Sequence, residues 1–242
     1  MKNIIFQYYI PKPPRFGEIS RKSFIRYTKN VGAEYLYVND VFMRPKHEYF
    51  EKLRLIYDTS FDKYDKLMFA DMDVIAMPEA ANIFDLEVDE IAGVPERNIP
   101  GMRVKVGWFM NKRPDQIKAK FKKHGAPLIK STLPGSDYRM INTGVVIWTK
   151  KARLKAREKF DDWTEWTRGS GPRQILLDQP YLNAMWNKYK FNVRELDREW
   201  NLFTRHYELV DDPSKLPYSH FQHFTAKEVN KHRIIKWYKD VF

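Results

Sequence analysis

Two aspartates, Asp71 and Asp73, are separated by one residue and directly follow the apolar run 67–70. An apolar run of this length predicts a buried strand of a parallel sheet. Residues two apart on an extended chain point the same way, so the two carboxylates can converge on one hard cation such as Mn²⁺ or Mg²⁺. Ligands of open α/β sheets bind outside the carboxyl ends of the strands, where this pair is expected. Asp-X-Asp triplets are also common in solvated turns and helix caps, so the pair needs support from other residues.

The segments before this pair predict how it is positioned. We expect strands over 4–9 and 34–38, an amphipathic helix over 18–31 and a second helix over 46–59. Together with the strand before Asp71, these segments follow the order β-α-β-α-β, which is typical of a doubly wound parallel sheet.

The rest of the chain continues the α/β pattern less regularly. The expected elements are a short helix over 78–86, strands over 90–94 and from 142–144 onward, a basic helix over 151–167 and a helix from 172 to 188, after which residues 194–196 lead into the pair 200–201. The segment 95–114, which contains Trp108, has weak periodicity, and long loops of this kind often bind ligands. No repeat or linker interrupts the pattern, which favours one compact domain.

The composition bounds the class of protein. The 242 residues carry 43 basic and 31 acidic side chains, a net charge of +12, which favours anionic partners such as nucleotides, nucleic acid, anionic polysaccharide or a membrane face. The absence of cysteine excludes disulfides, thiolate metal sites and a cysteine nucleophile. No apolar run approaches the ~20 residues that cross a bilayer, and the first apolar stretch is too short for a signal peptide. We therefore expect a cytoplasmic protein.

Missing motifs narrow the chemistry further. The chain has no Gly-x-Gly-x-x-Gly, Walker A, His-Glu-x-x-His or Gly-x-Ser-x-Gly segment. It also lacks zinc-finger, helix-turn-helix and RNP signatures, so nucleic acid is not an expected partner. If the protein binds phosphates, a metal and basic side chains must hold them.

Five short segments carry a resemblance to a known family. They are 64–73, 141–146, 177–183, the pair 200–201 and 223–227. Their order and spacing resemble those of GT-A glycosyltransferases, most closely the family 8 type that includes glycogenin and bacterial lipopolysaccharide galactosyltransferases.

This resemblance covers nearly the whole chain and implies its fold and organisation. The expected fold is GT-A, a Rossmann-like α/β architecture with a mostly parallel central sheet flanked by helices. Residues 1–242 would form one catalytic domain, with a nucleotide-binding half at about 1–110 and an acceptor-side half at about 111–242.

The resemblance also implies a metal site for the donor diphosphate. Asp71 and Asp73 would hold Mn²⁺ or Mg²⁺, and Met72 between them would belong to the nucleotide-sugar site. Since imidazole also suits Mn²⁺, His223 is expected to complete the metal shell, with His220 as its rival. Lys227 would contact the diphosphate as a point charge.

Further residues are implied around the sugar. Asn142 resembles the family residue beside the transferred sugar, and Gly144 would allow close approach. Asp178 and Gln179 resemble the Asp-Gln pair under the sugar ring, where the Asp would bind hydroxyls and the Gln would lie near the anomeric carbon. Solvated turn and helix positions are the alternative for these four residues.

The first two strands are expected to contribute the base pocket. Tyr8 and Tyr9 can stack on uracil, and the Gln7 amide can read the edge of the base. Asp40 is a second candidate for the base or ribose. Close family members often carry a small residue and an Asp after strand one, and they often end in Lys-Pro-Trp. This chain departs at both places, because Lys227 is followed by Glu and Val.

The implied activity is metal-dependent transfer of a hexose from a nucleotide diphosphate sugar. UDP-glucose or UDP-galactose is the expected donor, and a glycan or other hydroxyl compound is the acceptor, with segment 95–114 a candidate for lining its site. Retention of configuration is implied, by front-face attack of the acceptor hydroxyl with the leaving phosphate as base. An inverting mechanism, which needs an Asp or Glu base, stays open.

Two other classes of function stay open. A non-catalytic polyanion or nucleic-acid binding protein would use the basic surface, need no metal and bind with strong salt dependence. A metal-dependent nucleotidyltransferase or phosphohydrolase would share the Asp pair and turn over nucleotides without a sugar. The basic helix 151–168 is expected to be a solvated face, although peripheral contact with an anionic membrane or glycan would also suit it.

Overall fold

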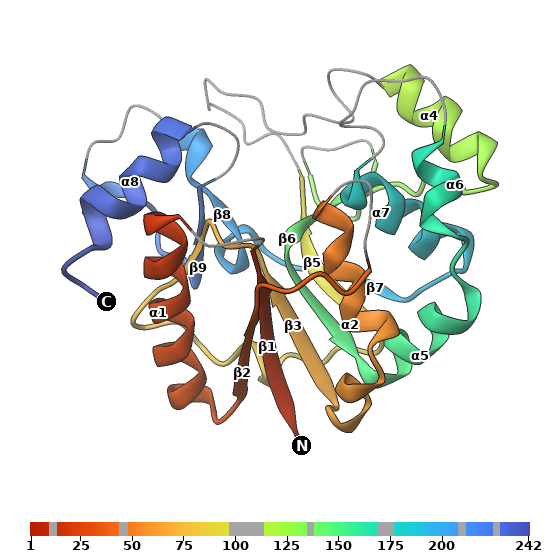
Figure 1. The fold of residues 1–242 in the computed structure, drawn as a ribbon. Coiled ribbons are helices and arrows are strands. Elements are labelled where there is room, and N and C mark those ends of the chain that lie inside the picture. The colour runs from red at the N-terminus through yellow and green to blue at the C-terminus, as the bar shows by residue number, and fades with distance from the viewer. Residues whose placement is uncertain are drawn as a thin grey trace.

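A six-stranded sheet with the strand order β2-β1-β3-β6-β5-β7 lies at the centre of the protein (Figure 1). The computed structural model describes residues 1–9, 14–43, 48–96, 114–134, 138–168, 177–207, 212–224 and 228–242. The strands of this sheet are β1 Asn3–Tyr8, β2 Glu34–Val38, β3 Lys66–Ala70, β5 Ile91–Pro95, β6 Ile141–Thr149 and β7 Val193–Glu195.

Strand β6 runs opposite to the strands on both sides of it. β1 is parallel to β2 and β3, and β5 is parallel to β7, whereas β6 pairs antiparallel with both β3 and β5. Ala70 at the end of β3 therefore faces Val145 in the first half of β6. Because of this reversal, the start of β6 lies at the same sheet edge as the carboxyl ends of β1 and β3.

A second, three-stranded sheet begins directly after the Asp71–Asp73 pair. It has the order β4-β9-β8, with β4 Val74–Ala76, β8 Leu202–Phe203 and β9 Phe221–His223. The β4–β9 pairing is antiparallel and places Val74 opposite His223. This small sheet brings the C-terminal part of the chain to the edge where the aspartates lie.

Helices cover both faces of the large sheet. In Figure 1, α1 and α8 lie to the left of the central strands, and α2, α5 and α7 lie to the right. The α-helices are α1 Arg15–Val31, α2 Arg54–Tyr57, α4 Pro114–Lys123, α5 Lys150–Lys159, α6 Trp163–Thr167, α7 Asp178–Lys188 and α8 Glu228–Tyr238. Short 3₁₀ helices occupy Glu48–Leu53, Thr59–Lys63, Ile83–Asp85, Arg198–Trp200, Thr204–Tyr207 and Pro213–Lys215.

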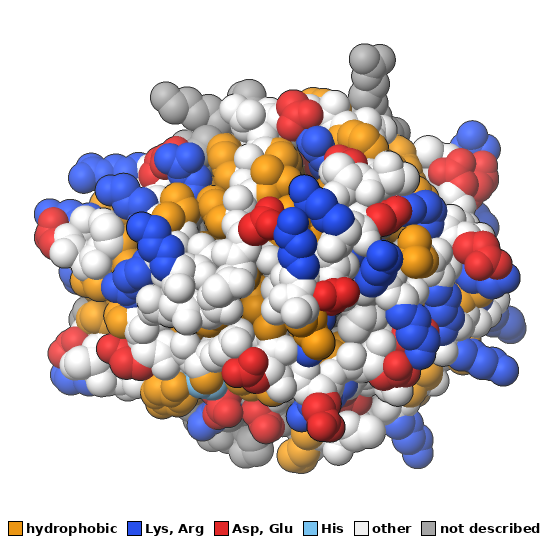
Figure 2. Space-filling model, turned by 90° about the horizontal axis from the view of Figure 1, so that it is seen from below, with side chains coloured by type: hydrophobic (Ala, Val, Ile, Leu, Met, Phe, Trp, Pro, Cys, Tyr) orange, Lys and Arg blue, Asp and Glu red, His pale blue; other side chains and the backbone are white. Residues whose placement is uncertain are grey.

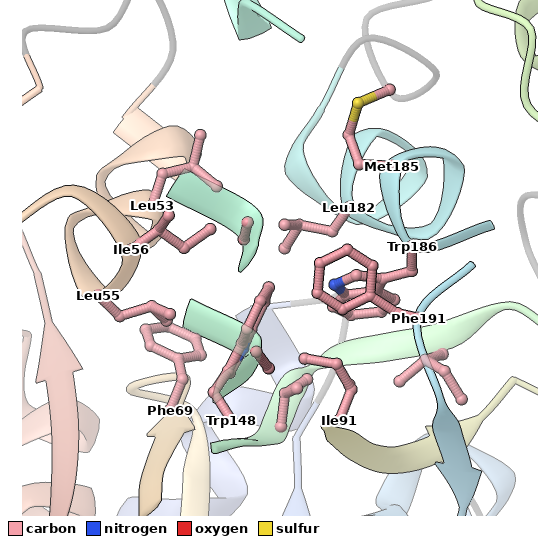
Figure 3. Close-up of a cluster of buried hydrophobic side chains, with 14 of the residues drawn as sticks. Leu53, Leu55, Ile56, Phe69, Ile91, Trp148, Leu182, Met185, Trp186 and Phe191 are labelled. Atoms are coloured by element: carbon pink, nitrogen blue, oxygen red, sulfur yellow. The ribbon is translucent and has the colours of Figure 1, made fainter. Parts of the chain in front are cut away.

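Alternate residues of the central strands enter two separate hydrophobic clusters. Phe6 and Phe69 belong to the cluster on the α2, α5 and α7 side, where Trp148 and Trp186 pack edge to face at 5.5 Å between ring centroids (Figure 3). Ile5 and its neighbours pack on the α1 side. Burial of one large side chain stabilises the fold by about 1.5–3 kcal/mol. The clusters on the two faces of the sheet therefore hold its strands, and the edge where they end, in a fixed position.

The predicted fold is confirmed, but several predicted helices differ. The helix expected over 46–59 is instead a 3₁₀ helix over 48–53 followed by one short α-helical segment, α2. Asp58 ends it, because the Asp58 carboxylate accepts a hydrogen bond from the Ser60 amide and caps the next 3₁₀ helix. The segment 78–86 is mostly non-helical and contains only one 3₁₀ turn.

The basic helix predicted over 151–167 is divided into α5 and α6. The carboxylate of Asp162 accepts a hydrogen bond from the Thr164 amide at 2.8 Å and starts α6. Phe160 leaves the helical path and packs edge-on against Tyr181. The Asp162 cap and the packing of Phe160 against Tyr181 together separate α5 from α6. The helix expected from 172 begins at Asp178 within the described residues, and most of segment 95–114 lies outside them.

The surface opposite the aspartates is mixed in charge. Figure 2 shows Lys and Arg side chains interspersed with Asp and Glu on the lower face. On α5, for example, Lys151 and Lys155 pair with Asp89 and Glu90. Within the described ranges, no helix has both the length and the apolar character needed to cross a membrane.

Candidate active site

Asp71, Asp73 and His223 form a cluster at the carboxyl edge of the large sheet, which we call the metal cluster. One ligand atom from each of the three side chains lies within 4.8 Å of the other two. The His223 Nε2 atom is 3.2 Å from Asp73 Oδ1. Burial raises the pKa of the Asp71 carboxyl above its usual range; Lys52 opposes this rise and Asp73 adds to it. These oxygen and imidazole ligands suit Mn²⁺ and related divalent cations.

Gly144 provides the space in which His223 lies. A Cβ atom at residue 144 would fall 2.2 Å from His223 Cε1 and 2.8 Å from Nδ1, so only glycine fits without a shift. The backbone carbonyl of Gly144 also accepts a hydrogen bond from the Asp71 amide at 2.8 Å. The start of β6 thus supports both the aspartate loop and the histidine.

A side-chain amide fixes the orientation of the His223 ring. Asn201 Oδ1 lies 3.1 Å from His223 Nδ1, while the Asn201 amide group donates to Asn142 Oδ1 at 3.0 Å. Asn201 Oδ1 can only accept, so His223 Nδ1 donates to it, and Nε2 is the ring nitrogen that faces Asp73. This arrangement is typical of a histidine prepared to bind a metal.

A buried network lies beside the metal cluster; its members are Lys52, Asn142, Thr143, Asp178 and Gln179. Lys52 Nζ is 2.7 Å from Asp178 Oδ2 and 3.5 Å from Asp71 Oδ1. Burial lowers the pKa of Lys52, but the two carboxylates outweigh this effect and raise it. Lys52 is therefore a charged ammonium between the two acidic groups.

Amide side chains complete the buried network. Gln179 Oε1 accepts from Asn142 Nδ2 at 3.2 Å and from the Thr143 amide at 3.4 Å, and Gln179 Nε2 donates to Glu96 Oε1 at 2.9 Å. The Thr143 hydroxyl donates to Asp178 at 2.8 Å. The start of β6 and the start of α7 are thereby held together by side chains that are less than a tenth exposed.

A pocket opens next to the metal cluster. Its lining residues are Tyr8, Tyr9, Phe16, Glu48, Tyr49, Asp71, Met72 and Asp73. Burial, with the carboxylates of Asp178, Asp71 and Glu48, raises the pKa of the Tyr8 hydroxyl, which therefore stays protonated. The pocket combines aromatic faces with a divalent-metal cluster, and a nucleotide offers a base and phosphates that fit these two features.

Comparison with known families identifies the class. The model of glycosyl transferase family 8 matches residues 19–231, which is most of the chain. The chain belongs to glycosyl transferase family 8. It is therefore a glycosyltransferase, and the predicted family and enzyme class are confirmed. No curated protein sequence matches it significantly.

Solved structures show the same fold. A glycosyltransferase involved in glycosylation of the major capsid of PBCV-1 has 14% sequence identity, with 97% of this chain and 100% of that chain covered and a TM-score of 0.58. The galactosyltransferase LgtC, in complex with donor and acceptor sugar analogues, has 12% identity, coverage of 97% and 94%, and a TM-score of 0.57. Likeness at these identities shows the fold.

Within this family 8 fold, most of the predicted residues lie together. Asn142, Gly144, Asp178 and Gln179 surround the metal cluster, and Tyr8, Tyr9 and Met72 line the pocket. His220, the rival metal ligand, lies elsewhere: its ring stacks on Trp200 at 3.9 Å and its Nδ1 accepts from the Ala81 amide. The structure thus brings His223, and not His220, to the aspartates. Lys227 lies outside the described residues.

The structure corrects the role of Gln7. Its side chain has no exposed surface; its amide donates to Ser20 Oγ and the Asp71 carbonyl, and its oxygen accepts from the Tyr35 hydroxyl. The polar atoms of the Gln7 side chain are thus bonded to protein groups, so Gln7 supports the aspartate loop and is not placed to read a base. Asp40 pairs with Arg54 at 2.9 Å and does not line the pocket.

Sequence reasoning gave no role to Lys52, Thr143, Glu96, Glu48 or Asn201. Lys52 left a signal, because it falls on the same predicted helical face as apolar residues at 49 and 56. A lysine on an apolar face indicates a buried partner of opposite charge. Thr143 and Asn201 lie in two of the segments that carry the family resemblance, but the sequence does not show their contacts. Glu96 and Glu48 gave no signal, since their surroundings depend on residues distant in the chain.

Proposed function

We propose that this family 8 enzyme transfers a hexose from a UDP-sugar, UDP-glucose or UDP-galactose, to a hydroxyl group of a glycan or other acceptor, with Mn²⁺ or Mg²⁺ and with retention of configuration. The observation that carries the proposal is the metal cluster at the side of a pocket with aromatic walls. The residues fit the metal: two carboxylates and an imidazole with an oriented lone pair converge within 4.8 Å. A bound divalent cation would supply Lewis-acid stabilisation of the diphosphate leaving group.

The base and the sugar of the donor would then bind in two neighbouring regions of the site. Tyr8, Tyr9 and Tyr49 offer ring faces for the uracil base. Asp178 lies beside Asp71 across Lys52, so it is close enough to the diphosphate position to accept hydrogen bonds from sugar hydroxyls. The donor sugar would therefore lie over the start of α7.

The contacts of Asp178 favour front-face attack over a covalent intermediate as the route to retention. Its carboxylate accepts hydrogen bonds from Lys52 at 2.7 Å and from the Thr143 hydroxyl at 2.8 Å. A carboxylate held in this way is a weak nucleophile, which disfavours a covalent glycosyl intermediate on Asp178. The acceptor hydroxyl would attack from the leaving-group side and pass its proton to the departing phosphate.

Calorimetric titration of UDP into the purified protein tests the proposal. We expect binding with Mn²⁺, no binding with EDTA, and at least a 100-fold loss of affinity in Asp73→Ala. The matched control is Asp115→Ala, whose carboxylate is 94% exposed on α4 and distant from the pocket residues. Failure of UDP to bind with Mn²⁺ would reject uridine, and GDP and dTDP would be titrated next.

The reaction itself is tested by incubation with UDP-glucose and UDP-galactose and NMR assignment of the product anomer. Retention gives an α-linked product from these α-linked donors, and a β-linked product would contradict it. If no nucleotide binds but nucleic acid binds with strong salt dependence, the net charge of +12 indicates a polyanion-binding protein instead. Turnover of a nucleotide without sugar would indicate a nucleotidyltransferase.

A further inference from the structure

Glu48 is an acidic residue at the wall of the pocket that has no assigned role. It is the first residue of the 3₁₀ helix Glu48–Leu53 and is exposed. It lines the same pocket as Tyr8, Tyr9 and Tyr49, together with both aspartates of the metal cluster. Glu48 is therefore in a position to touch whatever fills the aromatic part of this pocket.

The surroundings of Glu48 differ from those of the other acidic residues nearby. Asp71 and Asp178 pair with Lys52, and the Glu51 carboxylate accepts from the amides of Phe42 and Met43. Glu48, by contrast, makes no hydrogen bond or ion pair with any residue in the described parts of the chain. Its side chain is exposed and contributes to the lining of the pocket.

An unneutralised carboxylate is unfavourable in a site for a diphosphate, because the two negative charges repel each other. A carboxylate can only accept hydrogen bonds. Such a carboxylate can therefore bind only the part of the ligand that offers N–H or O–H groups. In a nucleotide this part is the nucleoside.

We infer that Glu48 is a specificity residue that accepts a hydrogen bond from the donor nucleoside, either from the imide N–H of the base or from a ribose hydroxyl. This inference rests on the proposed function.

The test is calorimetric titration of UDP, with Mn²⁺ present, into wild type, Glu48→Ala and Glu48→Gln. Hydrogen bonds to a charged group are worth about twice neutral ones. We expect Glu48→Ala to weaken UDP binding by at least 10-fold and Glu48→Gln to weaken it less. Asp115→Ala should bind UDP as wild type does. Affinity for Mn²⁺ alone should be unchanged in both Glu48 variants, since Glu48 is outside the metal cluster.

Two nucleotide analogues identify which group of the nucleoside donates the hydrogen bond to Glu48. If the base is read, wild type should discriminate against 3-methyl-UDP, which lacks the imide N–H, and Glu48→Ala should not. If the ribose is read, the same loss of discrimination should appear with 2′-deoxy-UDP. Equal discrimination by wild type and Glu48→Ala with both analogues would overturn the inference.

The direction of the change in UDP affinity distinguishes hydrogen bonding by Glu48 from simple charge repulsion. If Glu48 only repels the diphosphate, both variants should bind UDP as tightly as wild type or more tightly, and that result overturns the inference while leaving the proposed function intact. If wild type binds Mn²⁺ but no uridine nucleotide, the proposed function fails first and this inference fails with it.

Discussion

The metal cluster and the buried network lie side by side at one edge of the sheet, yet they are built differently. In the network, donors face acceptors: Lys52 is 2.7 Å from Asp178, and Gln179 accepts from Asn142 at 3.2 Å. In the metal cluster, three side chains that can each offer a ligand atom face one another within 4.8 Å. The hydrogen bonds of the network form between protein side chains, whereas a bound cation would complete the cluster. The network is therefore assembled before a ligand binds, and the cluster is completed by one.

The largest effect is expected from removing the cation of the network. In Lys52→Met, the carboxylates of Asp178 and Asp71 lose their buried partner, and breaking a buried pair in this way costs about 3–5 kcal/mol. Urea unfolding should show this decrease in the free energy of unfolding. The variant should also lose transferase activity.

A double variant sharpens this prediction. Lys52→Met combined with Asp178→Asn leaves no buried charge on Asp178 and should recover part of the lost stability. The exposed Lys118→Met serves as the control and should unfold as wild type does. If Lys52→Met is as stable as this control, the network is not held together by its ion pair.

The second effect concerns the space shared by β6 and His223. Gly144→Ala would place a methyl group 2.2 Å from His223 Cε1, so the ring must move away from Asp73. We expect a loss of Mn²⁺ affinity of about 100-fold or more, with stability reduced by about 1–3 kcal/mol. Metal titration measures the Mn²⁺ affinity, and urea unfolding measures the stability. Unchanged Mn²⁺ affinity would show that His223 is not a ligand.

A third, smaller effect is expected where the two regions meet. Asn201→Ala removes the acceptor for His223 Nδ1 without touching the ligand atoms. Loss of such an orienting partner typically costs 10- to 100-fold in metal affinity. In Asn201→Asp, which keeps an acceptor oxygen, Mn²⁺ affinity should remain closer to that of wild type. Equal losses in the two variants would argue against an orienting hydrogen bond.

The smallest effect is expected from His220, which the structure separates from the metal cluster. Burial lowers the pKa of His220, with Glu199 opposing, and its Nδ1 accepts from the Ala81 amide. The unfolded chain therefore binds a proton more readily, so the stability that His220 contributes is present above about pH 6.5 and is lost as the pH falls.

The free energy of unfolding should therefore fall by about 1 kcal/mol or less from pH 7.5 to pH 5.5 because of this residue. In His220→Gln the fall should be smaller, although the pKa of His124 is also lowered by burial and acts in the same direction. If the free energy of unfolding of His220→Gln depends on pH as that of wild type does, His220 does not contribute to this dependence. Mn²⁺ affinity should be the same in wild type and His220→Gln.

Sequence patterns predicted the strands better than the helices. β1, β2, β3 and β5 are short runs rich in apolar and aromatic residues between turn residues, a pattern that can be read locally although the strands pair with distant ones. The helix over 46–59 failed because apolar spacing cannot distinguish an α-helix from a 3₁₀ segment that must turn Lys52 inward. The helix over 151–167 failed because Asp162 looks equally suitable as a cap and as a surface residue.

The candidate site was predicted where family motifs exist and missed where partners are distant. Asp71, Asp73 and His223 were expected together, and the structure places them together. Gln7 was misplaced because a strand with both faces covered buries every central residue, including a polar one. The Lys52–Asp178 contact joins residues from opposite halves of the chain, and periodicity carries no information at that range.

The pairing of β4 with β9 has a consequence for how the protein is made. During synthesis the aspartates emerge first, and His223 follows about 150 residues later on β9, the strand that pairs opposite Val74. Contacts between residues so distant in sequence form slowly, because a long loop must close first. A nascent chain that ends before β9 has only the two carboxylates at this edge, so the capacity to hold the ion should appear only after β9 has been synthesised and has paired with β4.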